Sequence, residues 1–82
     1  MSILITITQR FPNLPGRLAI PLANIGWFTP ADVLLFLRTK YPHVRMREDA
    51  ENAIRNKILR EPSWGPRTSD AFLVYLKAHD VI

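Results

Sequence analysis

Residues 48–60, EDAENAIRNKILR, combine side chains that can read a nucleic acid with a spacing that suits a helix. Each residue of an α-helix turns by about 100°, so Asn52, Asn56 and, slightly aside, Arg55 share one face. The two isoleucines of the stretch point the other way. Asparagine pairs with adenine and arginine with guanine in the major groove, which an α-helix fits. The stretch therefore predicts a recognition helix. The alternative interpretation is the solvated face of an ordinary helix.

Basic residues on both sides of this stretch are expected to hold a phosphate backbone. The chain has eleven Lys and Arg against seven Asp and Glu, which gives a net charge of +4. Cations supply most of the affinity for nucleic acids, so this balance favours a polyanionic partner. The same balance also occurs in small domains for solubility alone. The expected phosphate-contacting residues are Arg38, Lys40, Arg45, Arg47 and Arg67, and Lys57 and Arg60 within the stretch are also expected to bind nucleic acid.

Enzyme chemistry finds little support in the sequence. His43 and His79 lie in different segments, and neither has a metal ligand at a suitable spacing. The three glycines stand far apart, so neither phosphate-cradling loop motif is present. There are no cysteines, which excludes disulfides and thiolate metal sites. We therefore expect no enzyme, no cofactor, no metal and no small-molecule substrate.

Three helices are expected in residues 29–82. Thr29 is a good N-cap, Pro30 suits a first helical turn, and Tyr41-Pro42 should end this first helix. A second helix is expected over about 48–60, because acids begin that stretch and bases end it. Ser69 is expected to cap a third helix.

The amino-terminal region is expected to form strands. The segment SILITIT alternates with a period of two and is rich in β-branched residues, which favours a strand. A second, poorer strand should follow a Pro-Gly turn, giving a β-hairpin or arm over residues 1–26. The chain is thus expected to be one small α+β domain, 1–82, with a three-helix, helix-turn-helix-like core at 29–82.

Residues 29–58 resemble the middle of a forkhead-type winged-helix domain. That family has a helix ending in an aromatic-Pro pair, a short basic turn and a recognition helix containing N-S-I-R-H-N-L. Here Tyr41-Pro42 matches the pair, and residues 52–58, NAIRNKI, lie in register with the motif. The resemblance places Asn52 and Asn56 at base-contacting positions and Arg55 beside them. The family's wing and first helix are not matched.

The expected function is therefore a small basic DNA-binding module that reads duplex DNA, regulatory or associated with chromatin or a viral genome. The alternative is a protein-interaction or homo-oligomerisation domain that uses the edge of the SILITIT strand or an aromatic patch near Trp27 and Phe28. No apolar run approaches the roughly 20 residues that span a bilayer, and no secretory leader is recognisable. We therefore expect an intracellular protein, nuclear or cytoplasmic, without membrane association.

Overall fold

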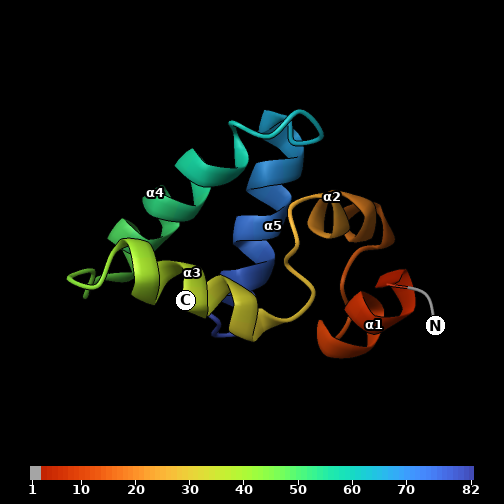
Figure 1. Ribbon diagram of the computed structural model, residues 1–82, viewed down its shortest axis with the longest axis horizontal. Helices are drawn as coiled ribbons and strands as arrows, with labels where there is room; N and C mark the ends of the chain where they lie inside the picture. Colours follow the sequence, from red (N-terminus) through yellow and green to blue (C-terminus); the bar gives the residue numbers. More distant parts are fainter. Residues whose placement is uncertain (1–2) are drawn as a thin grey trace.

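A computed structural model describes residues 3–82 of the chain, with side chains from Thr6 onward, and it is all-helical over that range. Figure 1 shows the arrangement, with α5 lying centrally between α4 and α2. The elements are α1 (Ile3–Arg10), a 3-10 turn η1 (Gly16–Leu18), α2 (Ala19–Asn24), α3 (Pro30–Lys40), α4 (Arg47–Ile58) and α5 (Pro66–Ala78).

The predicted β-hairpin, and with it the α+β class, is wrong. Residues 3–10 form α1, and residues 16–24 form η1 and α2, so residues 3–82 contain no strand. The pattern was ambiguous, because Ile7 and Phe11 also have the four-residue spacing of a helix face, and both are fully buried. The helix preference of β-branched residues is only slightly lower than that of other residues, so packing overrides it.

Pro21 lies in the segment where the poorer strand was expected, and it is compatible with the helix that forms there. Pro21 lies within the first turn of α2, where backbone N–H groups have no intrahelical partner in any case. Its carbonyl oxygen accepts a hydrogen bond of 3.1 Å from the indole Nε1 of Trp64. This bond ties α2 to the loop between α4 and α5.

The three helices after residue 28 are confirmed, and the start of α3 has the expected chemistry. The hydroxyl of Thr29 accepts a bond of 3.4 Å from the backbone N–H of Asp32. The Asp32 carboxylate accepts bonds in return from the N–H of Thr29 at 3.0 Å and of Phe28 at 2.8 Å. This reciprocal capping box fixes where α3 begins.

The predicted cap of the last helix is wrong. α5 begins three residues earlier than Ser69, with Gly65 at the N-cap and Pro66 in the first turn. Proline suits this position because its missing N–H is not needed there. Ser69 consequently lies inside the helix, where its side chain is buried.

An aromatic cluster fills the core, and Phe72 of α5 is at its centre. The Phe72 ring lies 5.5 Å from that of Trp64, and 6.2 Å from those of Phe11 and Trp27. Phe11 also contacts Tyr75, one turn further along α5. The cluster joins the end of α1, the α2–α3 connection and the α4–α5 connection to α5, so most of the chain is organised around one helix.

Tyr75 links this core to the amino-terminal half through its hydroxyl, which donates a hydrogen bond of 2.6 Å to the carbonyl oxygen of Pro12. Burial raises the pKa of Tyr75 above its ordinary value of 10.0. The folded chain therefore holds this proton to higher pH than the unfolded chain does. The stabilisation is complete below pH 10 and is lost as the pH rises through the folded-state pKa.

We expect Tyr75→Phe to lower the free energy of unfolding by about 1 kcal/mol at pH 7, because one buried hydrogen bond is lost. The variant should also lose less stability than the wild type between pH 9 and about 11, because the linked proton is gone. Urea unfolding followed by tryptophan fluorescence at several pH values measures both effects. Tyr41→Phe, which removes an exposed phenol, is the control. An unchanged pH dependence in Tyr75→Phe would contradict the assignment.

Candidate nucleic-acid interface

The two faces of α4 lie as the sequence predicts. Ile54 and Ile58 are fully buried, and Ala50 is nearly so. Asn52 and Asn56 are exposed on the other side, where their amides are free to contact a ligand. The two isoleucines are four residues apart, and so are the two asparagines. Residues at that spacing lie one above the other on a helix, so each pair shares one face. The exposed asparagine face is the first part of the candidate site.

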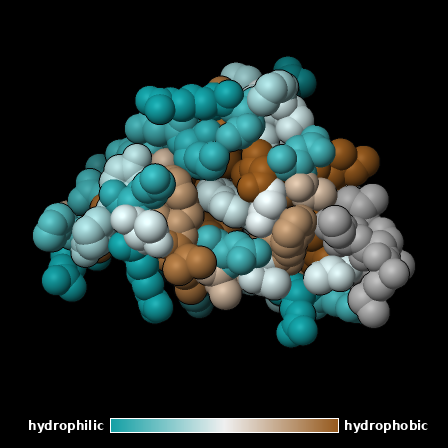
Figure 2. Space-filling model, viewed as in Figure 1, coloured by the Kyte–Doolittle hydropathy of each residue, from teal (hydrophilic) through white to brown (hydrophobic). Residues whose placement is uncertain are grey.

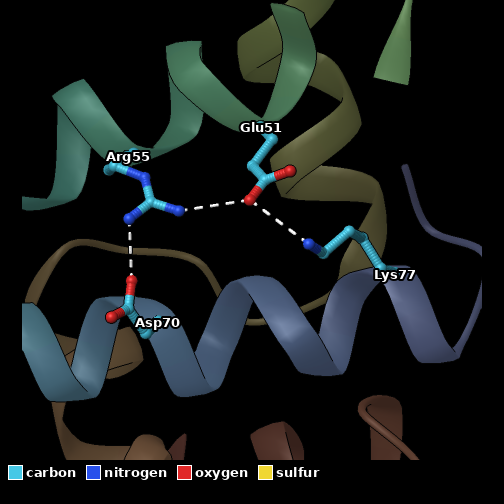
Figure 3. A network of polar contacts seen from close by, with 4 residues as sticks. All are labelled: Glu51, Arg55, Asp70 and Lys77. Atoms are coloured by element: carbon cyan, nitrogen blue, oxygen red, sulfur yellow. Dashed lines mark hydrogen bonds and ion pairs between the residues drawn. The ribbon is translucent and has the colours of Figure 1, made fainter. Parts of the chain in front are cut away.

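Arg55 does not share the freedom of its neighbours (Figure 3). Its guanidinium donates hydrogen bonds to Asp70 of α5 at 2.7 Å and to Glu51 of α4 at 3.1 Å. Lys77 of α5 also contacts Glu51, at 3.3 Å. These four side chains form a bridge between α4 and α5. To contact a base, Arg55 would first have to break its hydrogen bonds to both carboxylates. In the structure Arg55 instead holds α4 against α5.

Two further cations of the predicted set are also paired. Lys57 contacts Glu61 at 2.8 Å, one helical turn away. Arg47 lies 3.6 Å from Asp80, and both side chains are more than half exposed. An exposed pair at that distance contributes little stability and is readily exchanged for another anion. Arg47 is thus more available to a ligand than Lys57 is.

The other predicted cations have no carboxylate partner within residues 3–82, and all are exposed: Arg38, Lys40, Arg45, Arg60 and Arg67. The first two lie in the last turn of α3, and Arg45 lies in the short α3–α4 connection. Arg60 follows α4, whereas Arg67 lies in the first turn of α5. An unpaired cation can bind a phosphate without first breaking an ion pair.

A first cleft of about 480 Å³ brings three of the arginines together. Arg38, Arg45 and Arg47 contribute to its lining, which includes no carboxylate side chain. The apolar part of the lining comes from α3, the α3–α4 connection, the first turn of α4 and the last residues of the chain: Leu34, Leu37, Val44, Ala50, Val81 and Ile82. The cleft is therefore an apolar hollow bordered by three arginines, of which Arg47 is paired with Asp80.

A second cleft of about 330 Å³ lies between α3 and the end of α4. Lys40, Asn56, Lys57 and Arg60 line it, together with a single acid, Glu61, which is paired with Lys57. Tyr41 lines both clefts. We call the surface around Tyr41 that comprises these two clefts the α3–α4 corner.

Three predicted residues lie outside the clefts: Asn52, Arg55 and Arg67. Conversely, Tyr41 was expected to end α3 and no ligand contact was predicted for it, whereas in the structure it lines both clefts. One feature of the sequence indicated that Tyr41 would be exposed. Pro42 ends the helix directly after it and leaves Tyr41 at the C-cap. No local pattern pointed to Val81 and Ile82.

Charge and hydropathy are unevenly distributed over the surface. Figure 2 shows hydrophilic side chains gathered over α4 and the α3–α4 connection in this view. Glu48 and Asp49, in the first turn of α4, are exposed and have no ion-pair partner in the described chain. They stabilise the positive end of the helix but repel phosphate. The cationic part of the corner is therefore made by α3, the connection and the end of α4.

Comparison with protein-family models, with curated proteins and with solved structures finds no match for this chain. Among residues 3–82 no helix is long and apolar enough to cross a membrane. The described residues also contain no group of three or more His, Cys, Asp and Glu side chains placed to hold a metal ion. The geometry of the α3–α4 corner is thus the basis for a functional proposal.

We expect Arg55→Ala to lower the free energy of unfolding by about 0.5–1 kcal/mol, because it breaks a partly exposed bridge between two helices. A double-mutant cycle with Asp70→Ala should give a coupling energy of about 0.3–1 kcal/mol in urea unfolding. Arg45→Ala, which removes an unpaired arginine, is the control and should change stability by less than about 0.5 kcal/mol. A coupling energy of zero would mean that the bridge does not form in solution.

Proposed function

We propose that the protein binds nucleic acid, duplex DNA included, through the α3–α4 corner. The observation that carries this proposal is the gathering of unpaired cations around two adjoining clefts. Arg38 and Arg45 belong to the first cleft, Lys40 and Arg60 to the second, and none of them has a carboxylate partner in the described chain. A surface of this kind fits a ligand with several regularly spaced negative charges, which is the character of a nucleic-acid backbone.

Binding would draw its free energy mainly from counterion release. Four phosphates neutralised by these four cations give an expected slope of about −3.6 in log K against log salt on a duplex. Lys57 and Arg55 would add less, because each already has an acidic partner. The expected salt dependence is therefore weaker than the eleven Lys and Arg residues of the chain would give if all of them contacted phosphates.

Sequence reading would come from the exposed face of α4. Asn56 lines the second cleft and Asn52 lies one turn before it, so two amides are available to base edges next to the phosphate-contacting residues. Arg55 would act by holding α4 against α5. The helical pair α3 and α4 covers the residues that resemble forkhead domains, which supports a regulatory or genome-associated role. An intracellular location belongs to the same proposal.

The alternative was a protein-interaction domain that uses a strand edge or an aromatic patch. The described residues offer neither surface as it was expected. The SILITIT strand edge is not available, because residues 3–8 belong to α1. Of the expected aromatic patch, Trp27 is only 6% exposed and packs on Phe36 and Phe72, and Phe28 is partly buried against the core. The apolar side chains that are exposed outside the corner include Ile20, Leu35 and Val74, which lie on three different helices.

The proposal is tested by fluorescence anisotropy with a labelled duplex of about 20 base pairs, titrated at several salt concentrations. The wild type should bind in the micromolar range or tighter at low salt. Arg38→Gln/Arg45→Gln should bind at least about 10-fold more weakly and reduce the salt slope by about 2, because two phosphate contacts are lost.

The matched control is Arg10→Gln/Arg17→Gln. It changes the net charge equally, but its residues belong to α1 and η1, away from the α3–α4 corner in Figure 1. Its affinity should stay within about threefold of the wild type, because charges beyond a Debye length are screened. Absence of binding at low salt, or an equal loss in both double variants, would refute the proposed site.

A further inference from the structure

We infer that the first cleft receives an unpaired nucleobase, with Tyr41 as its stacking surface and the arginines beside it holding the adjacent phosphates. This inference rests on the proposed function and makes it more specific. The protein would then prefer strands with unpaired bases, such as single strands, frayed ends or bubbles, over intact duplex. Neither the sequence motif nor the resemblance to forkhead domains points to such a ligand.

The first argument is the exposure of Tyr41. Tyr41 is 41% exposed, and it is the one Phe, Trp or Tyr residue among the exposed large apolar residues of the described chain. Its ring lies 5.8 Å from that of Phe36 in an edge-on arrangement. Tyr41 lines both clefts and is exposed, so part of its surface remains open to them. An aromatic face of this kind stacks on any base, because every base has a π-face.

The second argument is the lining of the first cleft. A volume of about 480 Å³ is within the range of pockets that hold small organic ligands. Its apolar lining suits the faces of a base, and Arg38, Arg45 and Arg47 suit the phosphates on either side of it. A base within a duplex has both faces covered by its neighbours, so only an unpaired or extruded base can enter.

The third argument is the continuity of charge across Tyr41. Lys40 and Arg60 line the second cleft, which shares Tyr41 with the first cleft and its arginines. A single organic anion would use the cations of one cleft only. A strand that crosses Tyr41 places phosphates on both sides and uses both sets of cations. The distribution of positive charge therefore favours a polymer over a small amphiphile.

The test compares three labelled ligands by anisotropy: a thymidine strand of roughly 15 nucleotides, an abasic strand with the same number of phosphates, and a duplex of equal length. The wild type should bind the thymidine strand at least about 10-fold more tightly than the abasic strand, because only the first can stack. It should also bind the thymidine strand more tightly than the duplex.

The variants assign that preference to Tyr41. Tyr41→Ala should lose the discrimination between the thymidine and abasic strands, whereas Tyr41→Phe should keep it, because the ring remains. Leu35→Ala is the matched control, since Leu35 is also exposed and apolar but lies outside both clefts. Circular dichroism melting checks that each variant is folded. Rescue by phenylalanine separates stacking from a general loss of structure.

The outcomes also separate this inference from the proposed function. Equal affinity for the thymidine and abasic strands, or discrimination that survives Tyr41→Ala, would overturn the inference while leaving phosphate binding intact. Absence of binding to all three ligands at low salt would overturn both. Binding of a labelled peptide of alternating aspartate and leucine, lost in Tyr41→Ala, without discrimination between the strands, would assign the cleft to an acidic protein partner and refute the inference.

Discussion

The contact of Phe72 with three other aromatic rings is the interaction on which the rest of the structure depends. Phe72 is fully buried, and the rings of Phe11, Trp27 and Trp64 lie within 6.2 Å of it. Each comes from a different segment, so one side chain of α5 fixes the end of α1 and two connections. Aromatic pairs of this geometry contribute about 0.5–1.5 kcal/mol each beyond the apolar area that they bury. A chain of 82 residues has a small core, and this cluster is a large share of it.

Most of the acidic side chains have a partner within the fold. Of the acidic residues, Asp32 caps α3, while Glu51, Glu61 and Asp70 hold cations of α4 or α5. Within the α3–α4 corner, Lys57 is paired with Glu61 and Arg47 with Asp80, whereas the other four cations have no carboxylate partner in the described chain: Arg38, Lys40, Arg45 and Arg60. A modest net charge of +4 thus yields a locally strong positive surface. The same ion pairs explain why Arg55, which was expected to lie beside the base-contacting asparagines, is bound to two carboxylates.

The sequence predicted the helices whose signals are local and failed where the signal was ambiguous. Thr29 and Asp32 identify the start of α3 because a capping box needs only residues three apart. Ile7 lies in the alternating segment but also has a helical spacing to Phe11, and only packing against α5 decides between strand and helix. The partner of Arg55 at Glu51 is one turn away and was readable. Asp70 is 15 residues away on another helix, so no local pattern shows it.

In the candidate site, too, contacts between residues far apart in the sequence could not be predicted from local patterns. Tyr41 was readable as the end of α3, but Val81 and Ile82 reach the first cleft only through the packing of α5. The backbone of Tyr41 is held on both sides, because its N–H donates to Leu37 at 2.8 Å and its carbonyl accepts from Val44 at 3.1 Å. A ring on a fixed backbone loses little conformational entropy when a ligand stacks on it. The surrounding arginines are long and exposed, so ordering them costs more. The α3–α4 corner thus combines one preorganised apolar contact with adaptable cations, an arrangement that suits a ligand with a regular backbone and variable bases.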